Sequence, residues 1–275
     1  IRRAKHKVVV IEAIKLLESG LRSYCNTIWV TDTEENTQLQ RLIQKRKMAH
    51  DDALERIHAQ SAQGIKIKAA DVVIYNTKSF EDTWKQVTSA WQATVPAIST
   101  QDVPQAVKKV PAGKLSARRA GPKEAQTIAN FINRLSKGKR QMTRSDVMAA
   151  FGEKAFLFLL RGEDLVGLLG WQVENLVARV DDVYIKTDVP LAAALKAMTA
   201  EVERASKELQ CEAALLFIPP DLAQPREIWK SLEYSQRSIE ALSVRAWQEA
   251  ALESMPPGTT MLFKQLRKDR VLRPV

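Results

Sequence analysis

Four polar side chains between residues 38 and 60 are spaced so that they could hold an anion. Arg41 and Lys45 are four residues apart, and so are Arg56 and Gln60. In an α-helix, residues at this spacing lie on one face, about one turn apart. Each pair could therefore grip an oxyanion such as a phosphate at two points. Spacing of this kind is more often found on a solvated helix face, so that alternative stays open.

The surrounding residues predict an α/β unit that would position these side chains. Residues 38–60 have the apolar spacing of two short helices, and residues 79–91 that of a third. Short β-branched runs at 26–32 and 71–76 predict strands, and the apolar run 7–14 predicts a buried one. Strands that alternate with helices are typical of a parallel sheet.

This segment resembles the dephospho-coenzyme A kinases. The matching motifs are QL-x-RL at 38–42, AL-x-RI-x-AQ at 53–60 and AD-VVI-x-N at 70–76. The resemblance extends over roughly residues 7–92 and implies an α/β fold, namely a partial P-loop-kinase-like parallel sheet with a helical lid. In such kinases the lid closes on ATP, so the resemblance implies ATP and dephospho-coenzyme A as ligands.

The resemblance also implies roles for particular residues. Those assigned to the nucleotide-binding lid are Arg41, Lys45, Arg46, Arg56 and Gln60. Lys45 stands where the family tends to have Arg. An ammonium group would there replace a guanidinium that can donate two parallel hydrogen bonds. Asn76 would lie on the adenine side, and Glu12 would face the dephospho-coenzyme A site. For Glu12, a capping or solvated carboxylate is the alternative.

The phosphate-binding motif of such a kinase is absent from the sequence. G-x-x-x-x-G-K-[ST], whose amides and Lys cradle ATP phosphates, occurs nowhere in the 275 residues. With a first residue that is Ile, this suggests that the complete enzyme has a preceding segment with the P-loop and the catalytic base. We expect the complete enzyme to use ATP and Mg²⁺ to phosphorylate the 3′-hydroxyl of dephospho-coenzyme A, and this chain alone to be inactive. A true loss in a pseudoenzyme is the alternative.

The second half predicts a separate mixed α/β domain. Residues 93–113 contain three prolines and read as a linker, so the predicted domains are 1–92 and 114–275. The order of elements after 114 resembles a GNAT-type acyltransferase, which implies acetyl-coenzyme A or coenzyme A as a possible ligand. The turn expected to hold the pyrophosphate, KTDVPLAAAL at 186–195, has no Gly, and Pro190 donates no N–H. Acyl transfer and a non-catalytic binding or packing role therefore both stay open.

Composition restricts the class of protein. The net charge of +10 and the pI near 9.6 favour anionic ligands, and Cys25 and Cys211, the two cysteines, support neither a disulfide framework nor a zinc site. No apolar run approaches the ~20 residues of a membrane span. We therefore expect a cytoplasmic protein with no membrane partner. The basic C-terminal cluster lacks interleaved aromatic residues, so nucleic acid is not the expected partner, although a module that senses coenzyme A or binds nucleic acid stays a third hypothesis.

Overall fold

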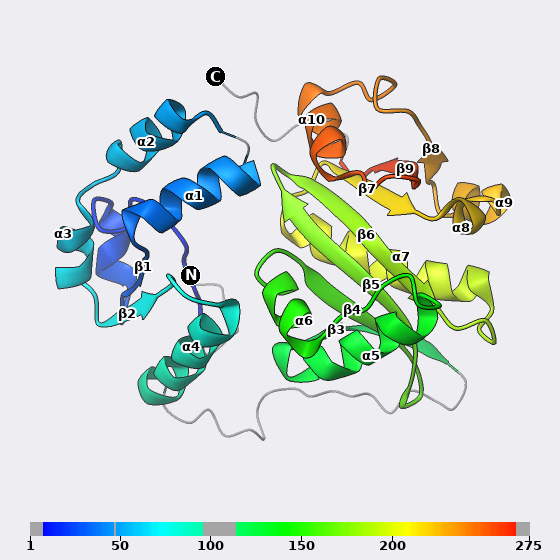
Figure 1. Ribbon diagram of the computed structural model, residues 1–275, viewed down its shortest axis with the longest axis horizontal. Coiled ribbons are helices and arrows are strands. Elements are labelled where there is room, and N and C mark those ends of the chain that lie inside the picture. Colours follow the sequence, from blue (N-terminus) through cyan, green and yellow to red (C-terminus); the bar gives the residue numbers. More distant parts are fainter. Residues whose placement is uncertain (1–7, 47, 96–113, 268–275) are drawn as a thin grey trace. The chain divides into compact units, whose positions relative to one another are not determined.

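The chain forms two compact units, which are described separately (Figure 1). A computed structural model describes residues 8–46, 48–95 and 114–267. The two units are Ile1–Val103 and Pro104–Val275. The predicted linker lies outside the described residues from 96 onward, so the domain limits stay predictions.

Unit 1 is built on two parallel strands, as the sequence predicts. β1 (Trp29–Asp32) pairs with β2 (Val72–Tyr75) from Trp29 opposite Val72 to Asp32 opposite Tyr75. The helices of this unit are η1 (Gly20–Tyr24), α1 (Glu35–Arg46), α2 (His50–His58), α3 (Gln63–Lys68) and α4 (Phe80–Thr94). The predicted helical pair within 38–60 and the helix at 79–91 are confirmed.

Local chemistry explains where the later helices begin. Asp51 and Asp52 lie in the first turn of α2, where carboxylates interact favourably with the helix dipole. Ser79 precedes α4, and its hydroxyl accepts the backbone N–H of Asp82 at 3.2 Å. α4 therefore starts where a side chain satisfies one of its free N-terminal amides, and α2 starts where acidic residues interact with its dipole.

The outer edge of β2 is occupied by a side chain of α4. The backbone N–H of Tyr75 donates to Gln86 Oε1 at 2.9 Å, and Gln86 Nε2 donates to the Tyr75 carbonyl, also at 2.9 Å. The amide of Gln86 thus satisfies both backbone groups of an edge residue that would otherwise lack partners.

The strand predicted at residues 7–14 is wrong. Residues 8–13 form no regular element, and the side chains of Val10 and Ile14 are 78% and 77% exposed. In the described part of unit 1, β1 and β2 pair with each other and with no third strand. Because a strand needs a neighbour to satisfy its backbone, apolar character alone does not create one here.

Unit 2 contains a mixed seven-stranded sheet, which confirms the predicted mixed α/β fold. The strands run in the order β3-β4-β5-β6-β7-β9-β8. They are β3 (Leu115–Ala120), β4 (Ala155–Arg161), β5 (Asp164–Glu174), β6 (Val177–Ile185), β7 (Ala213–Ile218), β8 (Ser235–Gln236) and β9 (Thr260–Gln265). β6 and β7 are parallel and are joined through the long helix α7 (Leu191–Glu208), whereas the other neighbours are antiparallel.

Helices cover both faces of this sheet. α7 packs on one face through Leu195, Met198 and Val202, and Trp171 of β5 donates from Nε1 to Ser206 Oγ of α7 at 3.1 Å within that core. The remaining helices are η2 (Pro122–Glu124), α5 (Ala125–Leu135), α6 (Arg144–Ala150), α8 (Pro220–Ala223), α9 (Arg226–Ser231) and α10 (Arg245–Ser254). α10 buries Trp247 on the other face, against Phe217 and Phe263. In Figure 1, α5 and α6 lie in front of the strands and α7 behind them.

The centre of the sheet has an irregularity that shapes unit 2. Gly170 pairs with Asp182 and Trp171 with Val180, so Asp181 is an extra residue in β6. In the described sheet, β6 pairs with β7 only from Val177 to Val180. Beyond that point β6 pairs only with β5, and the end of β7 pairs only with β9. The two parallel strands therefore separate towards their carboxyl ends.

Replacing Gly170 by Ala should destabilise unit 2. An added Cβ would lie 3.0 Å from Asp182 Cβ and 3.1 Å from Asp182 Oδ2, so the carboxylate would have to shift. We expect a loss of about 1–3 kcal/mol in the free energy of unfolding, the usual cost of overpacking, measured by urea denaturation. Gly121→Ala is the control, because a Cβ there meets nothing within 4 Å. Equal midpoints for both variants would contradict the prediction.

Candidate functional site

Polar groups gather at the carboxyl edge of the two-stranded sheet in unit 1. Asn76, which follows β2, donates its backbone N–H to the carbonyl of Asp32 at the end of β1 at 2.7 Å. Thr33 Oγ1 donates to the Asn76 carbonyl at 3.4 Å. In parallel α/β sheets, ligands bind beyond the carboxyl ends of the strands. This edge is therefore the candidate site of unit 1.

The side chains at this edge are held in defined orientations. Gln38 Nε2, at the start of α1, donates to the Thr33 carbonyl at 2.7 Å. Asn76 Oδ1 accepts from Thr83 Oγ1 of α4 at 3.0 Å, so among the described residues the Nδ2 group of Asn76 has no partner. Gln63 Nε2 donates to the Thr31 carbonyl at 2.9 Å. The arrangement leaves Asn76 with amide donors that a ligand could use.

The predicted lid residues lie on α1, on α2 and just after α2. His58 Nε2, at the end of α2, is 3.3 Å from Glu35 Oε1 at the start of α1, so the two helices run antiparallel. Arg41 is half-buried on α1, and Arg56 is exposed on α2. Within the described residues, neither arginine forms an ion pair. Both guanidinium groups are therefore available to an anion.

The remaining predicted residues that the structure describes are exposed. Arg46 is exposed in the last turn of α1, and Gln60 is exposed after α2. The side chain of Lys45 lies outside the described part of the structure. Glu12 is exposed, and no hydrogen bond or ion pair joins it to the other candidate residues in the described chain. Its substrate-side role stays a prediction.

Sequence reasoning missed the two threonines that hold Asn76. Thr33 directly follows a predicted strand, and a polar residue in that position was a usable signal. Thr83 lies seven residues beyond Asn76 on a helix, so only the turn of the chain after β2 brings it into contact. No local pattern indicates that contact.

Unit 2 contains a buried cluster of charges at the irregularity in β6. Lys154 Nζ lies 2.5 Å from Asp181 Oδ2 and 3.0 Å from Asp182 Oδ2. Arg140 forms an ion pair with Asp182 and donates to the hydroxyl of Tyr184 at 3.2 Å. Asp182 is only 5% exposed. Two cations and two carboxylates thus neutralise one another beside the point where β6 and β7 separate.

The cluster shifts the pKa values of Lys154 and Tyr184. Burial would lower the pKa of Lys154, but the charges of Asp182 and Asp181 outweigh it, and the net pKa is raised above the ordinary 10.5. Burial, followed by the charge of Asp182, raises the pKa of Tyr184. At neutral pH the lysine is therefore charged and the tyrosine is neutral. Because both carboxylates already have cationic partners, neither is free to act as a simple base.

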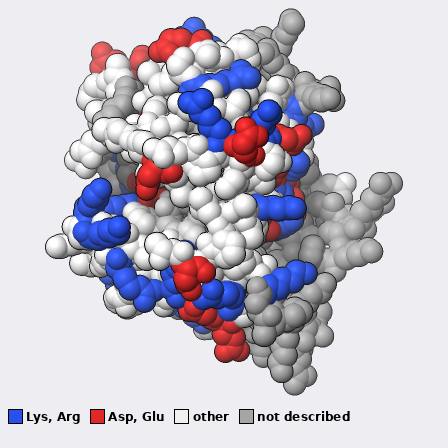
Figure 2. Space-filling model, turned by 90° about the vertical axis from the view of Figure 1, so that its right-hand side faces the viewer, with Lys and Arg blue, Asp and Glu red and all other residues white. Residues whose placement is uncertain are grey.

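On the face drawn in Figure 2, the Lys and Arg side chains do not gather into one continuous positive patch. Lys and Arg side chains there are interspersed with Asp and Glu. Some of the cations of unit 2 are paired within one helix, for example Arg204 with Glu201 on α7. Interspersed charges of this kind favour local anion sites over one extended basic stripe.

Unit 1 forms a parallel α/β unit in which helix α1 begins just beyond the carboxyl end of β1. Residues 1–82 match the family model for dephospho-CoA kinase, which confirms the resemblance. The dephospho-CoA kinase of Carboxydothermus hydrogenoformans is 38% identical over 84 residues, which cover 30% of this chain and 41% of that protein. The dephospho-CoA kinase of Listeria innocua is 40% identical over 84 residues, with 30% and 42% covered. The chain thus spans about two fifths of the length of these relatives.

Solved structures similar to this chain include acetyltransferases. A GNAT-family acetyltransferase from Staphylococcus aureus has a TM-score of 0.45 at 11% identity, covering 56% of this chain and 99% of that one. The ribosomal-protein-S18-alanine N-acetyltransferase of Escherichia coli has a TM-score of 0.43 at 8% identity, covering 58% and 99%.

Two further features are absent from the described residues. No helix there combines the length and apolar character that crossing a membrane requires. Nor does any group of three or more His, Cys, Asp or Glu side chains lie close enough to hold a metal ion.

Proposed function

We propose that unit 1 supplies the nucleotide-binding lid and the adenine-side wall of a cytoplasmic dephospho-coenzyme A kinase. The reaction transfers the γ-phosphoryl group of ATP to the ribose 3′-hydroxyl of dephospho-coenzyme A, the last step of coenzyme A synthesis. The observation that carries the proposal is the carboxyl edge, where Thr33 accepts from Gln38 and donates to Asn76. On the adjoining antiparallel helices, Arg41 and Arg56 form no ion pair with any described residue. The family match of residues 1–82 supports the same conclusion.

The chemistry assigned to these residues is positioning and charge neutralisation. Phosphoryl transfer spreads negative charge over the transferred group, and guanidinium groups stabilise that charge once water is excluded. Arg41 and Arg56 would contact the phosphates of ATP, assisted by Lys45, Arg46 and Gln60. Asn76 would donate to an acceptor nitrogen of adenine through its Nδ2 group. Glu12 would face dephospho-coenzyme A.

The described residues do not provide the whole site. They hold no cluster that fits Mg²⁺, so no step of the reaction is assigned to a metal ligand of this chain. The 275 residues also lack the glycine-rich loop that would hold the ATP phosphates. The proposal therefore requires a phosphate-binding loop supplied by another part of the enzyme.

Direct assay separates the kinase from its alternatives. The 275-residue chain, incubated with ATP, Mg²⁺ and dephospho-coenzyme A, is expected to form no coenzyme A above the blank. A polypeptide that also includes an in-frame G-x-x-x-x-G-K-[ST] segment encoded upstream of Ile1 is expected to form it. If the upstream coding sequence contains no such motif, the proposal fails and a vestigial kinase region is favoured.

The second candidate function is binding of coenzyme A or acetyl-coenzyme A by unit 2. It rests on the separation of β6 from β7 beyond Val180 and Leu216, which opens the sheet next to the start of the 18-residue helix α7. Beside that opening, Lys154 and Arg140 form ion pairs with Asp182, so this carboxylate is not free to act as a catalytic base. Binding without acyl transfer is therefore favoured over catalysis. Calorimetric titration with coenzyme A should detect binding, whereas acetyl-coenzyme A with a panel of amines should give no transfer. Absence of binding would remove this candidate.

A further inference from the structure

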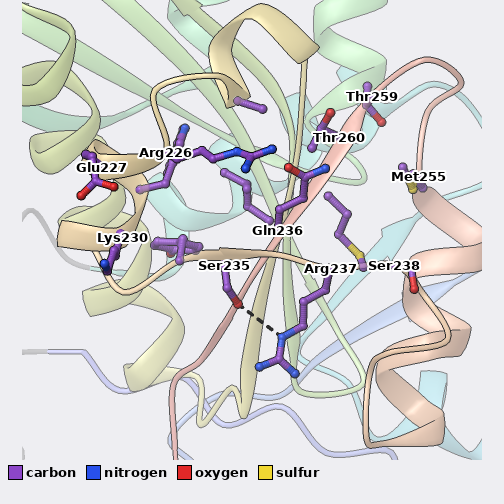
Figure 3. Close-up of a pocket in the computed structure, with 15 residues that line it drawn as sticks. Arg226, Glu227, Lys230, Ser235, Gln236, Arg237, Ser238, Met255, Thr259 and Thr260 are labelled. Atoms are coloured by element: carbon purple, nitrogen blue, oxygen red, sulfur yellow. Dashed lines mark hydrogen bonds between the residues drawn. The ribbon is translucent and has the colours of Figure 1, made fainter.

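A depression of about 830 Å³ lies at the edge of the unit 2 sheet, where α9, β8 and the start of β9 meet (Figure 3). This volume falls within the usual range of small-molecule sites. Its residues belong neither to the carboxyl edge of unit 1 nor to the separation of β6 and β7. The inference drawn from it is therefore independent of both proposed functions.

The base of the depression is apolar and fixed. Trp229 and Tyr234 line it and are almost fully buried, with ring centroids 5.9 Å apart in an edge-to-face arrangement. Trp229 Nε1 donates to the Leu222 carbonyl at 2.9 Å, so its polar group is satisfied within the protein. The polar side chains of the rim therefore surround a buried aromatic pair.

The rim carries more positive than negative charge. Arg226 and Lys230 are one turn apart on α9, and Arg237 follows β8, against one carboxylate, Glu227. None of the three cations forms an ion pair with any residue that the structure describes. The guanidinium of Arg237 lies 4.9 Å from the centroid of the Phe263 ring and donates from Nε to Ser235 Oγ at 3.3 Å. With three cations against one carboxylate, the rim therefore attracts anions.

Hydrogen-bonding groups converge at one point of this rim. In Figure 3, the guanidinium of Arg226 lies beside the amide of Gln236, and Thr260 lines the same part of the depression. Gln236 is fixed by strand pairing with Leu262, and Thr260 by pairing with Ile218. A planar guanidinium with neighbouring amide and hydroxyl donors is the donor set that phosphate oxygens prefer.

We propose that this depression binds a small phosphorylated molecule, whose phosphate contacts Arg226, Gln236 and Thr260. Lys230 and Arg237 contribute attraction from the rim, and the apolar base contacts the rest of the ligand. An acidic peptide pairing along the sheet edge is less well supported, because β8 is only two residues long and offers little backbone to an added strand.

The test is an amide NMR titration of the full 275-residue chain with inorganic phosphate and, separately, with glycerol 3-phosphate. Both should cause saturable shifts at residues 235–238 and 259–261, and the ester should bind more tightly because it also contacts the base. Arg226→Gln should weaken binding about tenfold, the effect of losing one charge-assisted hydrogen bond. Arg245→Gln is the matched control, since Arg245 is an exposed arginine of unit 2 outside the depression.

The outcomes are distinguishable. Tighter binding of the ester than of inorganic phosphate supports a phosphorylated metabolite, whereas equal affinities would reduce the proposal to a site for free phosphate. Equal weakening by Arg226→Gln and Arg245→Gln, or shifts confined to other residues, would overturn it. It would also be overturned if a poly-glutamate peptide shifted the same amides at lower concentration than either phosphate compound.

Discussion

Replacing Arg56 by Ala in the complete kinase that we propose is expected to reduce the rate of coenzyme A formation by about 100-fold or more. Arginines that neutralise the transferring phosphoryl group commonly contribute factors of this size or larger. Arg56 is exposed on α2 and makes no ion pair among the described residues, so its loss should cost little folding stability. Steady-state assay with ATP and dephospho-coenzyme A measures the effect.

The control for this variant is Arg22→Ala. Arg22 is also an exposed arginine of unit 1, in η1 and outside the carboxyl edge, so its removal should leave turnover unchanged. Thermal unfolding of both variants checks that neither has lost its fold. Unchanged turnover in Arg56→Ala would count against the assignment of α1 and α2 as the lid, even if the kinase activity itself were present.

The Lys154→Met variant should lose about 3–5 kcal/mol of unfolding free energy, the typical cost of removing one member of a buried ion pair. The change removes the lysine that contacts both Asp181 and Asp182, and it leaves Arg140 paired with Asp182, which is almost completely buried. Urea denaturation followed through amide resonances of β6 measures the loss in unit 2 alone. A cost below about 1 kcal/mol would show that water or rearrangement compensates the carboxylates.

Lys186→Met is the matched control for that variant. Lys186 pairs with Asp164 at 3.0 Å, but Asp164 is half-exposed, so this pair should contribute no more than about 1 kcal/mol. The effect of Lys154 also depends on pH. Because its folded-state pKa is raised, its stabilisation is fully present below the ordinary value of 10.5 and is lost as the pH rises through the folded-state value. The stability difference between parent and Lys154→Met should therefore shrink only in strongly alkaline solution.

Much of the fold of unit 1 could be predicted, because its signals are local. The β-branched runs that contain Trp29 and Val72 form strands, and the apolar spacing around Leu42 and Leu54 forms helices. The run that contains Val10 has equal apolar character but remains outside any sheet. The two cases differ in whether a neighbouring strand is present to pair with. The amino-acid composition of the run itself does not indicate this.

The charged cluster of unit 2 could not be predicted for a related reason. Consecutive residues of a regular strand point to opposite faces, so Asp181 and Asp182 would be expected to diverge. The extra residue opposite Gly170 in β6 lets both carboxylates reach Lys154. That irregularity depends on the register between two strands. The rim of the α9 depression was missed similarly, since Arg226 and Gln236 come from separate elements.

The contact between Gln86 and Tyr75 determines the direction in which the small sheet can be extended. A side-chain amide at Tyr75 uses both backbone positions that an incoming strand would need, so growth on that border would first require Gln86 to be expelled. On the opposite border, Gln63 takes only the carbonyl of Thr31. Any strand added to this sheet would therefore join alongside β1, and β2 would remain at the border.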